Sequence, residues 1–233
     1  MDDSLRRLVR LPVGLALELL VSGHVDPPIP QMNLRPTLPA EIDPRGELDL
    51  LTFLQSQAAA ATRPLDVTVT GHSKGGALAP TVALWLADAL RSGAAGEAWD
   101  VKGNAHVSCH AFAGPTPGNA AFAQRLDAML GAAHHHLRNT NDIVTHAWQD
   151  DELRQIPSLY DKRSAPFEPL LNRIANGVQQ FQYRQALTGV RKFKGALDSN
   201  RLFGAEFVHQ HMEAYLEELE LTAEGIHAFT FFV

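Results

Sequence analysis

A serine flanked by glycines, between a strand pattern and a helix pattern, constrains the fold of this chain more than any other feature. Residues 65–70 alternate as Leu-Asp-Val-Thr-Val-Thr, which predicts a strand, and residues 75–91 carry the spacing of a helix. The pattern Gly71-His72-Ser73-Lys74-Gly75 joins them. We expect a Cβ at Gly71 or Gly75 to collide with the backbone of so tight a turn. The arrangement predicts a serine hydroxyl held clear of the sheet, beside the N–H groups of a helix N-terminus.

The segments downstream of this turn predict an α/β chain. Alternating apolar residues predict strands over 105–112 and 134–138, with a helix over 120–130 between them that is capped by Asn119 or Gly118. Because strands and helices alternate, we expect a mostly parallel sheet with helices on both faces. The helix after the serine is expected to bury an apolar stripe made of Leu78, Val82, Trp85, Leu86 and Ala89.

The remaining segments fit a single domain over residues 1–233. We expect an amphipathic helix rather than a leader in residues 1–21, a proline-rich connection over 22–46, and a helix from Asp43 to about residue 60. Residues 150–205 break the alternation and predict an insertion with short helices and a strand pair around 181–185. This insertion is either a lid or pocket segment or a solvated surface excursion. Residues 226–233 form either a last strand or an apolar tail.

Composition excludes several classes of protein. The chain of 233 residues is 45% hydrophobic and 20% charged, which is typical of a globular protein, and its net charge of −6 argues against nucleic acid as a partner. The single cysteine, Cys109, excludes an internal disulfide and is expected to be buried. No stretch is apolar for long enough to predict a transmembrane segment. The compartment stays open, with a cytoplasmic location favoured over a secreted one.

A serine nucleophile requires a base and a carboxylate that orients the base. Asp142 is the predicted carboxylate, because it follows the strand over 134–138 and therefore lies at the same sheet edge as Ser73. The alternative for Asp142 is an ordinary turn or helix cap. The predicted base is His211, directly before a helix over 212–219, and His209 is the alternative. His146, close to Asp142 in sequence, remains a further candidate.

The other histidines are predicted to be structural. His72 belongs to the serine turn and is expected to point away from Ser73. Residues 134–136 are consecutive histidines on a strand, so their side chains face opposite ways and do not converge on one ion. His106 and His110 are expected in the core or at a sheet edge. We therefore predict no metal and no cofactor.

With these residues placed, the chain resembles the class 3 (fungal-type) lipases, and most of all their bacterial branch. The matching motifs are Val69 to Pro80 with G-H-S-x-G-G-A-L-A-P, Ala111 to Asn119 with A-F-A-G-P-T-P-G-N, Asn141-Asp142-Ile143-Val144, and His211 followed by Tyr215. The resemblance implies an α/β-hydrolase fold and hydrolysis of acylglycerols or simpler lipid esters through an acyl-enzyme. It implies Ser73 as nucleophile, Asp142 as orienting acid, His211 as base, and transient contact with a lipid interface.

Two departures from the family pattern leave alternatives open. Members of the family carry an upstream strand that ends in Gly-Thr or Gly-Ser and supplies a second oxyanion donor, and residues 1–64 contain no such motif. The backbone N–H of Lys74 is the predicted first donor, Ser22-Gly23-His24 is a weak substitute for the second, and Lys74 stands where an apolar residue is usual. The alternatives are therefore an impaired or truncated hydrolase-fold protein with a binding role, and a related acyltransferase.

Overall fold

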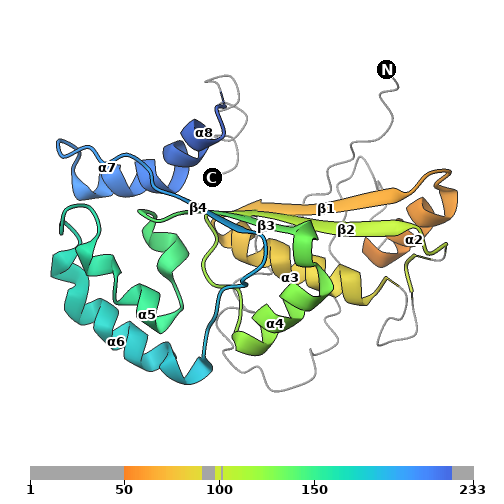
Figure 1. Cartoon of the computed structure of the whole chain (residues 1–233), viewed down its shortest axis with the longest axis horizontal. Helices are drawn as coiled ribbons and strands as arrows, with labels where there is room; N and C mark the ends of the chain where they lie inside the picture. The colour runs from red at the N-terminus through yellow and green to blue at the C-terminus, as the bar shows by residue number, and fades with distance from the viewer. Residues whose placement is uncertain (1–49, 91–97, 101, 222–233) are drawn as a thin grey trace. The chain divides into compact units, whose positions relative to one another are not determined.

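The computed structural model describes residues 50–90, 98–100 and 102–221 (Figure 1). The predictions for residues 1–21, for the proline-rich connection over 22–46, for the helix start at Asp43, for Ser22-Gly23-His24 and for residues 226–233 lie outside these ranges. Within the described residues no helix is long and apolar enough to cross a membrane.

Helices and strands follow one another in the order that the sequence predicts as far as residue 139. The elements are α2 (Leu50–Ala60), β1 (Leu65–His72), α3 (Lys74–Asp88), β2 (Ala105–Phe112), α4 (Ala120–Met129), β3 (His134–Asn139), α5 (Asp150–Leu153), α6 (Glu168–Val178), β4 (Val190–Phe193), α7 (Phe203–Val208) and α8 (Ala214–Glu218). Short 3₁₀ turns lie between several of them, and a π-helical turn, His209–Glu213, joins α7 to α8.

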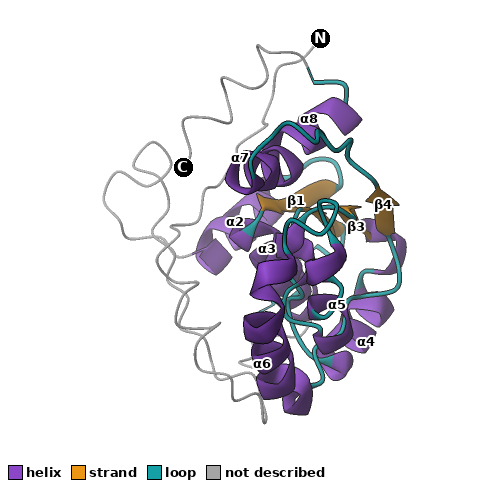
Figure 2. Ribbon diagram, turned by 90° about the vertical axis from the view of Figure 1, so that its left-hand side faces the viewer, coloured by secondary structure: helices purple, strands orange, loops and turns teal. Residues whose placement is uncertain are grey.

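The strands form a single four-stranded parallel sheet in the order β1-β2-β3-β4. Cys109 pairs with His134 across β2 and β3, and His136 pairs with Val190 across β3 and β4. Figures 1 and 2 show α3 and α4 on one face of the sheet and α7 and α8 on the other. The predicted α/β class, with a parallel sheet covered on both faces, is confirmed.

The fourth strand corrects the sequence prediction. The strand pair expected around 181–185 is absent from the described structure, in which Tyr183 forms an isolated bridge with Asn119. The fourth strand of the sheet is instead Val190–Phe193, which also lies in the predicted insertion. Arg191 and Lys192 are exposed there, as charged residues on edge strands commonly are. Because these two charged residues interrupt the apolar alternation, the sequence pattern did not predict this strand.

The chain divides into two compact units, and the division falls within β1 and β2. The first unit holds, among the described residues, 50–67 and the described part of 88–106. There α2 buries its apolar face, Trp99 is fully buried, and the carboxylate of Asp100 accepts hydrogen bonds from the N–H groups of Asn104 and Ala105. The second unit holds 68–87 and 107–221, and it contains all the predicted catalytic side chains. The single-domain assignment stays a prediction.

Helix α3 packs on the sheet through its smallest residues. Gly76, Ala77, Ala79, Pro80 and Ala83 are buried. Three members of the predicted stripe are only half-buried, namely Leu78, Val82 and Trp85. Leu86 and Ala89 of the same stripe are buried as predicted. The small residues at the start of the helix are buried because a helix that approaches a sheet closely must present small side chains.

Two histidines of β3 are buried, and His135 between them is exposed. His134 donates from Nδ1 to the carbonyl oxygen of Thr188 at 3.1 Å, whereas Nε2 of His136 has no hydrogen-bond partner among the described residues. Burial lowers the pKa of His136 to about 3, with smaller contributions from the charges of Arg138 and His134. No group of three or more metal-ligating side chains occurs in the described part of the chain.

We predict that His136 makes the fold sensitive to acid. Below pH 6.5 the histidine binds a proton in the unfolded chain, whereas the buried ring in the folded protein binds one only near pH 3. The free energy of unfolding therefore falls as the pH drops from 6.5 to about 3. The fall is at most about 1.4 kcal/mol per pH unit. The measurement is the difference in unfolding free energy between His136→Leu and wild type, determined by urea unfolding at two pH values. We expect this difference to shift in favour of the variant by about 1–2 kcal/mol when the pH is lowered from 7 to 5. His135→Leu, on the exposed side of the same strand, is the control; an equal pH response in both variants would contradict the assignment.

Candidate active site

Ser73 lies on a strained turn between β1 and α3. Its φ of 61° is in the left-handed region, which non-glycine residues seldom occupy. Its N–H donates to the carbonyl oxygen of Phe112 at 3.0 Å, and its own carbonyl oxygen accepts from the N–H of Gly76 at 2.9 Å. Backbone strain of this kind persists only where the surroundings hold it, and it clusters at functional sites. Helix α3 starts at the next residue, Lys74.

Glycines make this turn possible, although not the pair that the sequence predicts. A Cβ on Gly71 would lie 2.2 Å from the carbonyl oxygen of Gly75, as expected. A Cβ on Gly75 would meet no described atom within 4 Å, so that prediction is wrong. The second close approach is at Gly76, whose Cβ would lie 2.4 Å from the carbonyl oxygen of Phe112 and 2.8 Å from Cα of Gly114.

Asp142 uses its two carboxylate oxygens for different purposes. Oδ1 accepts from the N–H of Val144 at 2.9 Å and caps the 3₁₀ turn that follows. Oδ2 accepts from the hydroxyl of Tyr215 and from Nδ1 of His211, both at 2.9 Å. The side chain is fully buried. The cap and the acid facing a base were alternatives in the sequence, and the structure places both contacts on the same residue.

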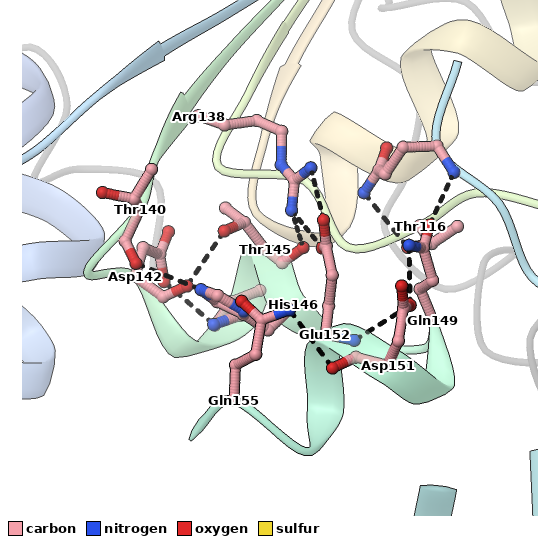
Figure 3. Close-up of polar contacts among 12 residues, drawn as sticks. Thr116, Arg138, Thr140, Asp142, Thr145, His146, Gln149, Asp151, Glu152 and Gln155 are labelled. Carbon is pink, nitrogen blue, oxygen red and sulfur yellow. Dashed lines mark hydrogen bonds and ion pairs between the residues drawn. The ribbon is translucent and has the colours of Figure 1, made fainter. Parts of the chain in front are cut away.

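The loop that carries Asp142 is held by an ion pair between Arg138 and Glu152 (Figure 3). Arg138, at the end of β3, donates from Nη2 to the carbonyl oxygen of Thr145 at 2.6 Å and to Glu152 at 2.5 Å. The hydroxyl of Thr145 donates back to the carbonyl oxygen of Asp142 at 2.9 Å. The carbonyl oxygen of Asp142 therefore accepts hydrogen bonds from both the N–H and the hydroxyl of Thr145.

His211 lies inside a helix and not in the loop that the sequence predicts. The chain is helical from Phe203 to Glu218, and His211 is the central residue of the π-helical turn. Nε2 of His211 is 2.8 Å from Oγ of Ser73, and the ring of Phe207 stacks on the imidazole at a centroid distance of 5.8 Å. Single π-turns inside helices often mark functional sites. A sequence prediction that relies on the 3.6-residue period of an α-helix does not detect a π-turn.

The structure thus brings together Ser73, His211 and Asp142, in that order of hydrogen bonds. Because the Asp142 carboxylate only accepts, Nδ1 of His211 carries the proton and Nε2 faces the serine hydroxyl as an acceptor. Chemically, such an arrangement can remove the hydroxyl proton as the oxygen attacks a carbonyl carbon and return it to a leaving group.

The remaining base candidates lie elsewhere. His209 is buried and makes its contacts with Glu213, at 2.9 Å from Nδ1, and with Glu217. His146 donates from Nε2 to the carbonyl oxygen of Thr140 at 3.1 Å. Neither has a contact with Ser73 among the described residues. The rings of His110 and His135 lie with their centroids 4.6 Å apart and are tilted by 31°, and His106 is exposed.

His72 has a role that sequence reasoning missed. Its Nε2 donates to the backbone carbonyl oxygen of His211 at 2.8 Å, and its ring lies 4.8 Å from that of His211 and edge-on to Tyr215. Burial lowers the pKa of His72, and the neighbouring His211 lowers it further. Strand alternation from Thr68 and Thr70 already indicates which face His72 occupies. Only the fold shows that the helix carrying His211 covers that face.

Residues 49–152 match the family Lipase (class 3), a range that includes Ser73 and Asp142 and ends before His211. The fold is similar to the crystal structure of M37 lipase, with a TM-score of 0.66 and 26% sequence identity over 93% of this chain and 61% of that one. The chain therefore spans about three fifths of the length of that lipase. No curated protein matches the sequence. The structural match supports the predicted α/β-hydrolase fold.

We predict that the two neighbouring glycines at the start of α3 respond oppositely to alanine. Gly76→Ala should cost about 2 kcal/mol or more of unfolding free energy, because its Cβ meets the backbone of β2 and neither partner can retract. Gly75→Ala should be neutral or stabilise by up to about 1 kcal/mol, since alanine favours the helix and the space is open. Urea unfolding of both variants measures the contrast. Equal losses would show that the close approach is not what excludes a side chain.

Proposed function

We propose that this chain is a lipase of the class 3 type that hydrolyses carboxylic esters through an acyl-enzyme on Ser73, and the family match over residues 49–152 and the likeness to a solved lipase support this proposal. The observation that carries the proposal is the bridging position of His211, 2.8 Å from Oγ of Ser73 and 2.9 Å from Oδ2 of Asp142. Acylglycerols and simpler lipid esters are the proposed substrates.

The proposed reaction has two halves that share one base. His211 accepts the proton of Ser73 as Oγ attacks the ester carbonyl carbon, and it then gives that proton to the departing alkoxide, which leaves an acyl group on Oγ. A water molecule, deprotonated by the same ring, releases the acid and restores the serine. Asp142 stays ionised throughout and stabilises the imidazolium that forms in each half.

The developing oxyanion is proposed to lie at the N-terminal end of α3. The backbone N–H of Lys74 is the proposed donor, and the positive end of the helix dipole adds to it. The Lys74 side chain lies half-buried at this end of the helix. The substitute second donor in Ser22-Gly23-His24 lies outside the described residues.

Exposed apolar side chains support the proposed contact with a lipid interface. Phe167 and Leu170, from the segment over 150–205, are 43% and 57% exposed, and Leu202 and Val208, at the two ends of α7, are 82% and 50% exposed. The ring of Phe167 lies 5.1 Å from that of Phe203, so this segment packs against the helix that leads to His211. We propose that the segment forms part of the acyl pocket or its cover.

The first test is the hydrolysis of short-chain and long-chain aryl esters by wild type and Ser73→Ala. We expect the variant to lose at least ~10⁴-fold in kcat, because the proposed nucleophile is removed. Ser158→Ala, an exposed serine on a short turn, is the control and should keep wild-type rates. Equal rates in wild type and Ser73→Ala would exclude the proposal and leave the binding role as the better one.

The second test separates the two candidate bases. His211→Gln should reduce kcat by roughly 10⁴-fold, because the imidazole that faces Ser73 is lost. His209→Gln, which removes only the contacts with two glutamates, should change kcat by less than about 3-fold. Steady-state rates at a fixed pH measure both. A loss confined to His209→Gln would make His209 the base.

A further inference from the structure

The geometry points to Asn139 and Gln210 as positioning residues, whose side-chain amides hold the π-turn that presents His211 to Ser73. This inference rests on the proposed function, because it assigns a role to residues around the proposed base. Neither residue stood out in the sequence, and the side chain of neither bonds to the side chain of Ser73, Asp142 or His211; the contact with Asp142 is through the backbone carbonyl oxygen of Asn139, which accepts from the N–H of Asp142 at 3.0 Å.

The π-turn receives hydrogen bonds from side chains outside its own helix. Asn139 donates from Nδ2 to the carbonyl oxygen of Gln210 at 2.9 Å, and His72 donates to the carbonyl oxygen of His211 at 2.8 Å. The N–H of Ala214 reaches back to the carbonyl oxygen of His209, which is the wide turn itself. Side-chain donors that reach successive carbonyls of a widened turn hold it against return to a regular helix.

Asn139 joins three segments of the chain that meet beside the site. Its side chain is fully buried, and its Oδ1 accepts from the N–H groups of Asn141 and Gly195 at 3.0 and 2.9 Å. Its own N–H donates to the hydroxyl of Tyr215, the same hydroxyl that donates to Asp142. One residue at the end of β3 thus bonds to the acid loop, to the segment after β4 and to the helix of the base.

Gln210 has only one orientation available to its amide. Its Nε2 donates to the carbonyl oxygen of Ala196 and to Oε1 of Glu206, both at 2.7 Å, and these groups can only accept. Its Oε1 must therefore accept, and it does so from Nδ2 of Asn139 at 2.7 Å. Hydrogen bonding runs in a fixed direction, from Asn139 through Gln210 to Glu206.

Glu206 anchors the far end of this network. Its carboxylate is fully buried, lies 3.7 Å from the guanidinium of Arg163 and 4.0 Å from that of Arg201, and accepts from the N–H of Asp198. Moving a buried carboxylate away from its charged partners is energetically costly, so the position of Glu206 is well defined. The residue just before His211 is therefore held on both sides, and the ring position follows from that constraint.

The test is the substitution Asn139→Asp, which keeps the shape of the side chain and removes its donor. One oxygen of the aspartate can still accept from Asn141 and Gly195, but the other would face the two oxygens of Gln210. We expect kcat on an aryl ester to fall by about 100-fold, the effect of moving a catalytic group by about 1 Å, with KM changed by less than about 3-fold. Asn119→Asp, the same change at the cap of α4, is the control and should leave kcat and KM unchanged.

A second variant separates positioning from loss of structure. In Asn139→Asp combined with Glu206→Gln, the amide of Gln210 can reverse, so that it donates to residue 139 and accepts from residue 206, with no change in net charge. The reversed amide loses its hydrogen bond to the carbonyl oxygen of Ala196, and the carbonyl oxygen of Gln210 still faces residue 139, so the expected recovery is partial. This double variant should regain at least tenfold in kcat over the single one. The inference would be overturned if the double variant recovered no kcat, or if the single variant changed KM alone and left kcat at the wild-type value.

A crystal structure of Asn139→Asp makes the outcome independent of the proposed activity. We expect Nε2 of His211 beyond hydrogen-bond distance of Oγ of Ser73, with the sheet unchanged. If wild type hydrolyses no ester, the proposed function fails, and the displaced or undisplaced ring still decides whether Asn139 positions His211. An unmoved ring would overturn the inference.

Discussion

The close contact between the start of α3 and the end of β2 is the constraint on which the rest of the second unit depends. Gly76 and Gly114 approach until a Cβ on either would lie within 2.8 Å of backbone atoms of the other side. That approach draws the turn before α3 against β2, where the N–H of Ser73 bonds to Phe112 and the residue is held at a φ of 61°. The backbone thus sets the direction of the Cα–Cβ bond of Ser73 independently of the base. The other members of the site then need only to reach a point that the backbone has already set.

Much of the fold and part of the site could be predicted from the sequence, because the necessary signals are local. Strand β2 has the predicted bounds, and Asn119 caps α4 as expected, since alternation and capping involve residues close together in the chain. Asp142 was also within reach, because the end of a parallel strand lies at the same edge as Ser73. Strand β4 was not, because its exposed charges remove the alternation on which the prediction relies.

The features that the sequence could not predict are those that depend on contacts between distant segments. His211 was selected by its order in the chain, but its place in a π-turn depends on donors from the ends of β1 and β3. Nothing in the sequence distinguishes Gln210 from other polar residues, because its partner Asn139 is 71 positions away. The collision at Gly76 instead of Gly75 has the same origin, since it involves β2 and not the turn itself. Periodicity within one segment carries no information about such pairs.

The carboxylate of Asp142 shows why structural and catalytic duties need not compete in this site. Because Oδ1 is tied to the N–H of Val144, and the loop is fixed further by Thr145 and Arg138, the plane of the carboxylate is set by the backbone and not by His211. Tyr215 holds Oδ2 from a second direction, and burial excludes water from the group. The imidazole can therefore turn toward a leaving group and return without any movement of its partner. A cap in the sequence and an orienting acid in the site are in this case consequences of the same geometry, in which one oxygen anchors the group and the other remains directed at the base.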